Sequence, residues 1–169
     1  MSIDQVRNAL RTSGLTAALQ MLNERVPHRF TAVYQINGDF MRNVAIVDKS
    51  GEVVPDDLLS VPFTSSFCQF VLKDGFFRLS SLHDERLEGH PFRGIVEGYV
   101  GVPLSREGGA LIGTFCHFDF PAQPLSDDEF EFMQQVALEM PPYVAQAGTR
   151  SGVGSHSILP HMTHRPPQA

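Results

Sequence analysis

Apolar side chains recur at helical spacing through the first 28 residues, in two groups that Gly14 separates. Ser2 and Gln5 form a capping box before the first group, and Pro27 follows the second. The pattern predicts two short helices or one broken helix. We expect their apolar stripe to pack on its own domain, and the alternative is a helical contact between two copies of the chain. The stripe consists of Val6, Ala9, Leu10, Leu15, Ala18, Leu19, Leu22 and Val26.

Strand patterns follow the two helices and come in pairs. Residues 30–37 and 40–48 are rich in β-branched and aromatic side chains, and only Gly38-Asp39 lies between them, which predicts a β-hairpin. Residues 98–105 and 110–120 form a second such pair around a Gly-rich turn at 106–109.

Helical patterns flank the second hairpin. We expect a helix from Thr64 to Gly75, a short strand over 76–80 and a polar loop over 81–97. A capping box at 125–129 opens a last helix, which Pro141-Pro142 must kink or stop. Because hairpins dominate, the sheet should be antiparallel and covered by helices, an α+β fold.

Composition adds boundaries to this order. All 13 Phe lie between positions 30 and 132, whereas residues 149–169 contain no acidic residue and no Phe. We therefore expect an N-terminal helical segment at 1–28, a globular domain at 29–148 and a flexible tail at 149–169.

The charge and cysteine content exclude several classes. The net charge of −6 argues against a broad nucleic-acid surface, and no apolar run is long enough for a membrane span. Two cysteines are too few for a disulfide framework, and no secretory signal is visible, so we expect a cytoplasmic protein.

Five motifs stand in one order along the chain, and together they resemble the GAF domain, a sensory fold related to PAS domains. They are SSFCQFV, LHDERLEGHP, YVGVPL, GTFCHFD and PLSDDEF. The resemblance covers about residues 30–140. It implies an antiparallel sheet of five to six strands with N- and C-terminal helices on one face. On the other face it implies a pocket under a roof, here residues 64–73 and 81–97. Such pockets bind cyclic nucleotides, tetrapyrroles, haem or small metabolites, and the sequence leaves the ligand and any cofactor unknown.

The polar loop carries four candidate ligand-binding residues: His83, Arg86, His90 and Arg93. A guanidinium fork suits a carboxylate or phosphate, and the alternative is that neighbouring acids pair with these arginines on a solvated surface. Tyr99 can add a hydroxyl at the start of the next strand. The candidate pocket set is completed by Phe67, Cys68, Cys116 and His117.

The sequence predicts no catalytic residue and no metal site. Neighbours in a strand point to opposite faces, so Cys116 and His117 cannot act as nucleophile and base. The free methionine-sulfoxide reductases, which are GAF relatives, use cysteines in the loop, and residues 81–97 contain none. The bilin-attachment and phosphodiesterase signatures are missing too. The tail histidines at 156, 161 and 164 fit incidental composition better than metal binding.

These observations predict a non-catalytic sensory or small-ligand-binding protein, acting through a signalling partner or through homodimerisation by its terminal helices. One alternative is a small cysteine-dependent redox enzyme or sensor that uses Cys68 or Cys116. The other is an interaction module with a vestigial pocket, filled by Phe67, Phe70, Phe92 and Phe118.

Overall fold

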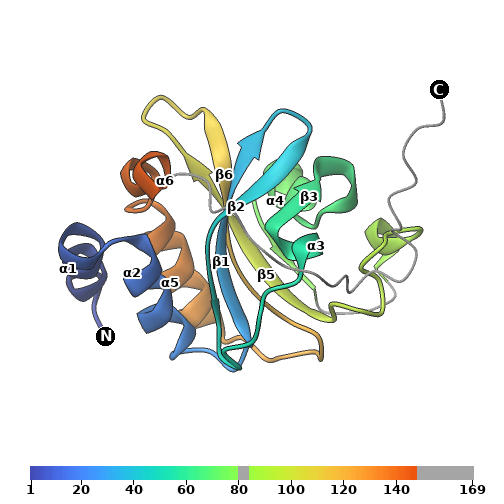
Figure 1. Ribbon diagram of the computed structural model, residues 1–169, viewed down its shortest axis with the longest axis horizontal. Coiled ribbons are helices and arrows are strands. Elements are labelled where there is room, and N and C mark those ends of the chain that lie inside the picture. The colour runs from blue at the N-terminus through green and yellow to red at the C-terminus, as the bar shows by residue number, and fades with distance from the viewer. Residues whose placement is uncertain (80–83, 148–169) are drawn as a thin grey trace.

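A six-stranded sheet separates two layers of helices (Figure 1). The computed structural model describes residues 1–79 and 84–147, with side chains to residue 145. One face of the sheet is covered by α1 (Ile3–Ser13), α2 (Leu15–Asn23), α5 (Asp127–Ala137) and α6 (Pro141–Ala147). The other face carries α3 (Asp56–Leu59), α4 (Cys68–Asp74) and two 3₁₀ turns, Phe63–Ser65 and Glu85–Leu87.

Every strand pair in the sheet is antiparallel, and the strand order is β3-β2-β1-β6-β5-β4. The predicted α+β fold with five to six antiparallel strands is therefore confirmed. The strands are β1 (Phe30–Asn37), β2 (Phe40–Asp48), β3 (Ser60–Pro62), β4 (Phe77–Arg78), β5 (Gly98–Ser105) and β6 (Leu111–Asp119).

The apolar stripe of the first 23 residues packs inside the chain. Gly14 has a φ of 93°, which separates α1 from α2. Leu10 and Leu19 are fully buried in a core that they share with Phe115 of β6 and Val136 of α5. The helix layer and this face of the sheet thus form one hydrophobic core.

The roof helix begins later than the sequence pattern predicts. Its first residue is Cys68 and not the residue after Thr64, because Ser66 is extended and its hydroxyl donates to the Phe63 carbonyl at 2.7 Å. This local bond between side chain and backbone competes with a helical turn. The predicted end is correct: Gly75 is left-handed, and its N–H donates to the Val71 carbonyl at 2.9 Å.

Short elements depart furthest from the prediction. Of the strand expected at 76–80, β4 covers Phe77–Arg78, the Leu79 N–H also donates to the Tyr99 carbonyl at 2.8 Å, and residue 80 lies outside the described residues. Neither α3 nor β3 was expected. Elements of two to four residues are too short to show a hydrophobic period.

Pro141 stops one helix and starts another. The N–H groups in the first turn of a helix have no partner inside that helix, so the missing N–H of Pro141 costs α6 no hydrogen bond. Helix α6 begins at Pro141, four residues after α5 ends. No helix within residues 1–79 or 84–147 is long and apolar enough to cross a bilayer. The predicted tail at 149–169, with its three histidines, lies outside the described residues.

Candidate ligand pocket

A cavity of about 40 Å³ lies between the sheet and its roof. In the structure the roof comprises α3, residues 63–74 and residues 84–97, so it includes one more helix than the sequence predicted. Its walls are almost entirely apolar, and both layers contribute side chains. The cavity is bordered by Tyr34, Leu58, Val61, Ser66, Phe67, Cys68, Phe92, Val96, Tyr99 and Phe118.

The few polar groups of the pocket are paired with one another or with the backbone. The Tyr34 hydroxyl donates to the Leu58 carbonyl at 2.6 Å, which ties β1 to α3. The Cys68 sulfur lies 3.2 Å from the Thr114 hydroxyl and 3.9 Å from the Tyr99 hydroxyl. Burial raises the pKa of both tyrosines, so their hydroxyls stay protonated.

The Phe67 side chain stands between the cavity and a cluster of aromatic rings. Its ring stacks on His90 at 4.6 Å between centroids and meets the Tyr99 ring edge-on at 5.0 Å. Phe77 and Phe92 lie 5.7 and 6.1 Å away. The Phe67 ring therefore lies within an aromatic enclosure, which is formed by the rings of Phe77, His90, Phe92 and Tyr99.

The structure brings some of the predicted pocket residues together. Phe67, Cys68 and Tyr99 border the cavity, and His90 lies behind Phe67. Cys116 is fully buried on the same side of the sheet, where its thiol faces the Ala32 carbonyl at 3.7 Å.

The structure places His117, a predicted pocket residue, on the opposite face of the sheet from this cavity. Side chains alternate along β6, so Cys116 points to the roof and His117 to the helix layer. There its Nδ1 lies 2.7 Å from the Thr31 hydroxyl, and its ring meets Phe115 edge-on.

The loop arginines also lie away from the cavity. Arg86 is exposed, and its guanidinium pairs with Asp84 at 2.6 Å and Asp74 at 3.0 Å. Arg93 is exposed as well. The acids that pair with Arg86 fit the solvated-surface alternative for that arginine. His83 lies outside the described residues.

Several pocket residues were not found from the sequence. Leu58, Val61 and Ser66 come from short elements without a periodic signal. Tyr34 was recoverable, because the strand period places it on the same face as Phe30 and Ala32.

Neither thiol is activated. Burial raises the pKa of Cys68 and, more strongly, of Cys116, and only the thiolate is a good nucleophile. Within the described ranges, no group of three or more His, Cys, Asp or Glu residues is placed to hold a metal ion.

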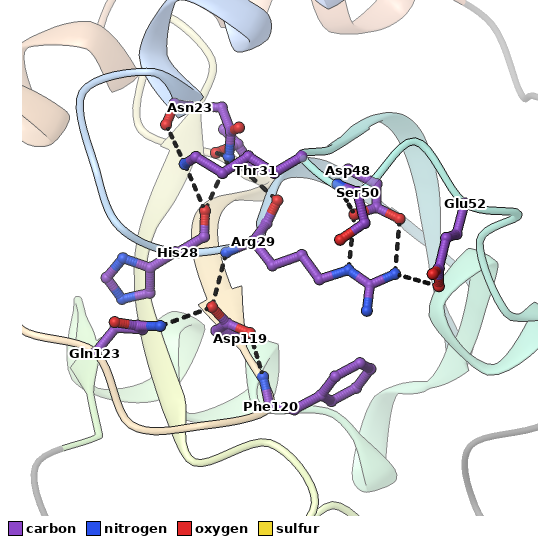
Figure 2. Close-up of polar contacts among 11 residues, drawn as sticks. Asn23, His28, Arg29, Thr31, Asp48, Ser50, Glu52, Asp119, Phe120 and Gln123 are labelled. Atoms are coloured by element: carbon purple, nitrogen blue, oxygen red, sulfur yellow. Dashed lines mark hydrogen bonds and ion pairs between the residues drawn. The ribbon is translucent and has the colours of Figure 1, made fainter.

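A second polar cluster ties the helix layer to the sheet at the connector between α2 and β1 (Figure 2). The Asn23 amide donates to the His28 carbonyl at 3.2 Å and to the Thr31 hydroxyl at 2.9 Å. Lys49 donates to three connector carbonyls, and Asp119 accepts from the Arg29 N–H at 3.0 Å. The path from the N-terminal helices into the sheet is thereby fixed.

Two buried histidines face each other in this cluster. The rings of His28 and His117 lie 6.0 Å apart, and within residues 1–79 and 84–147 neither His28 Nδ1 nor His117 Nε2 has a hydrogen-bond partner. Burial lowers the pKa of His28 to about 4 and that of His117 well below its usual value. Both rings are therefore neutral at pH 7.

Replacing Gly101 is expected to disturb the pocket from the sheet side. A Cβ at Gly101 would lie 2.7 Å from the Tyr99 hydroxyl and 2.8 Å from the Val71 side chain. Gly101→Ala should therefore displace Tyr99, change the near-ultraviolet dichroism and cost about 2 kcal/mol in urea unfolding. Gly109→Ala is the control: this turn position has open space around it and a φ of 91°, so it should lose about 1 kcal/mol through backbone conformation and leave the tyrosine signal unchanged. An unchanged tyrosine signal in Gly101→Ala would contradict this packing.

Comparisons with known proteins agree with the architecture. No protein-family model matches the chain, and no curated protein sequence matches it. Solved structures do match. The GAF domain of an Acinetobacter phosphoenolpyruvate-protein phosphotransferase superposes with a TM-score of 0.67 at 12% identity, over 86% of this chain and 91% of that one.

Two further matches have different chemistry. A type II free methionine-R-sulfoxide reductase from Thermoplasma acidophilum has a TM-score of 0.63 at 18% identity, over 87% and 97% of the two chains. A phycocyanobilin-bound GAF domain of a cyanobacterial phytochrome has a TM-score of 0.62 at 16% identity, over 87% and 96%. The chain therefore has the GAF-domain fold, as the sequence motifs predicted.

Proposed function

We propose that this protein is a non-catalytic sensory GAF domain that takes a small, largely apolar ligand between the sheet and the roof. The observation that carries the proposal is the apolar cavity between the sheet and the roof, with a few paired polar groups in its wall. Small-molecule sites have this composition, because apolar walls supply affinity and a few polar groups fix orientation.

The size of the cavity limits the ligand. Sites for drug-sized molecules have volumes of about 300–1,000 Å³, whereas this cavity holds about 40 Å³. A nucleotide, a haem or a tetrapyrrole needs a different arrangement of the roof. A ligand acts in such a system by binding one roof arrangement more tightly than another.

The same small volume favours a second candidate, an interaction module whose pocket is filled by its own side chains. Phe67, Phe92 and Phe118 are buried and line the small cavity under the roof. In that case the chain binds its partner in the fold described above, and no small molecule regulates this binding.

A redox enzyme of the methionine-sulfoxide reductase type has the least support. Both thiols are buried and protonated, and the reductase likeness is one of fold alone. We expect Cys68→Ser and Cys116→Ser to leave any sulfoxide turnover at background, as in the unaltered chain.

A thermal-shift screen with a filled-pocket variant tests the proposal. Val61→Leu/Val96→Leu adds two methylenes at the cavity wall and should stabilise the fold by about 1 kcal/mol. Val53→Leu adds the same group at a position that is 61% exposed, and it is the matched control. Nucleotides, haem, amino acids and small aromatic compounds form the screen.

We expect at least one compound to raise the Tm of the unaltered chain and of Val53→Leu, and not that of the filled variant. Uniformly null shifts would favour the interaction module. A shift that survives in the filled variant would place the ligand elsewhere.

The signal is proposed to leave through a partner protein or through a second copy of the chain. Arg25, which follows α2, forms a two-bond pair with Glu129 of α5, and Arg7 of α1 pairs with Glu139, which follows α5, so ion pairs link the N- and C-terminal helical segments. Light scattering should report a dimer, and a monomer near 18.7 kDa would remove self-association from the account.

A further inference from the structure

The Phe67 ring already has the surroundings of a bound ligand. His90 stacks against the ring, Tyr99 meets it edge-on, and Phe92 lies at a tilt with 6.1 Å between the ring centroids. The ring also forms part of the cavity wall, so its displacement would join the cavity to this enclosure. Aromatic pairs in these geometries add favourable energy beyond the area they bury.

His90 holds a hydrogen-bond donor beside this enclosure. Its Nδ1 accepts from the Phe92 N–H at 3.1 Å, and therefore the proton of the neutral ring is on Nε2. Among the described residues, the buried Nε2 makes no hydrogen bond of good geometry, and only a weak hydrogen bond with the Ser66 backbone raises the pKa of His90 against the lowering by burial. A buried donor that is poorly paired is costly, and a well-placed acceptor on a ligand would relieve that cost.

We infer that the pocket takes a small aromatic molecule bearing a hydrogen-bond acceptor, whose ring displaces Phe67 and whose acceptor receives the His90 Nε2–H. This inference rests on the proposed function and names its ligand class. Phe67 acts as an internal competitor: the ligand binds only to the fraction of molecules in which that ring has moved away, and its apparent affinity falls by that fraction.

Matched probes separate the two parts of the inference. Acetophenone carries a ring and a carbonyl acceptor, isopropylbenzene has the same shape without the acceptor, and cyclohexyl methyl ketone keeps the acceptor without the aromatic ring. Each is titrated into the full chain while the methyl NMR signals of Val61 and Val96, which border the cavity, are followed.

The variants are chosen to keep the fold. Phe67→Leu removes the competing ring, and Phe115→Leu makes the same change in the core on the opposite face of the sheet. His90→Leu removes the donor, and His90→Gln keeps one.

We expect acetophenone to bind Phe67→Leu about tenfold more tightly than it binds the unaltered chain. Its affinity for Phe115→Leu should equal its affinity for the unaltered chain. Its preference over isopropylbenzene should be about tenfold, absent in His90→Leu and restored in His90→Gln. Equal binding of acetophenone and isopropylbenzene, or of acetophenone and the cyclohexyl ketone, overturns the inference and leaves the proposed function standing. If no probe binds any variant and the thermal-shift screen is blank as well, both fail.

Discussion

Acidification from pH 6.5 to 4 is expected to lower the free energy of unfolding by about 3 kcal/mol through His28 alone. His28 and His117 are 1% and 0% exposed, and burial lowers the pKa of both in the folded chain. A histidine in the unfolded chain has a pKa near 6.5. Below that pH the unfolded chain binds more protons, and therefore stability falls until the folded pKa of about 4 is reached.

The surrounding charges decide how the two rings share this effect. Asp119 raises the pKa of His28 and Lys49 lowers it, while His28, Lys49 and Arg25 all lower the pKa of His117. Protonation of either ring therefore places a new cation beside existing ones, at the junction of α2 and β1.

Urea unfolding measured by circular dichroism between pH 4 and 7.5 tests this expectation. His28→Leu removes one titrating ring, and His117→Asn keeps a polar partner for the Thr31 hydroxyl. In the double variant, the decrease in the free energy of unfolding on acidification should be at most half of that in the unaltered chain. His90→Phe in the roof should reduce this decrease by a smaller amount. If stability falls equally with pH in the double variant and in the unaltered chain, carboxylates such as Asp48, and not the two histidines, determine the loss of stability in acid.

Gly113→Ala is expected to cost about 3 kcal/mol, or roughly 9 °C in Tm. Gly113 pairs with Gln35 of β1 and Leu104 of β5. A Cβ there would overlap the Tyr34 carbonyl oxygen. That atom belongs to the backbone of a central strand, so it cannot move away as a side chain can.

Gly108→Ala is the matched control for thermal and urea unfolding. Gly108 has a φ of 92° in the turn between β5 and β6, with nothing within 4 Å of an added Cβ. It should lose about 1 kcal/mol from backbone conformation alone. Equal losses in the two variants would contradict the close approach of β1 and β6.

The sequence predicted the large elements because each has a full hydrophobic period and a chemical boundary. Gly14 separates the first two helices, Gly38-Asp39 closes the first hairpin, and Pro141 interrupts the last helix, all as the patterns indicate. The alternation in β6 also places Cys116 and His117 on opposite faces, which removes His117 from the pocket set.

The pocket itself could be predicted only in part. Phe67, Cys68 and Tyr99 come from elements with a clear pattern, whereas Leu58 and Val61 come from elements of three or four residues. The polar loop suggested arginine ligands, but local acids pair with Arg86. The buried donor of His90 depends on a local turn, in which the Phe92 N–H donates to the His90 Nδ1, and on the stacking of Phe67 against the ring, which no hydrophobic period reveals.

A methyl NMR map of a compound that raises the Tm tests the central claim most directly. If the ligand lies between the sheet and the roof, signals of Leu58, Val61 and Val96 should shift, while those of Leu19 and Val136 in the helix-side core stay in place. Shifts confined to the helix-side residues, with the three pocket residues unmoved, would contradict the account.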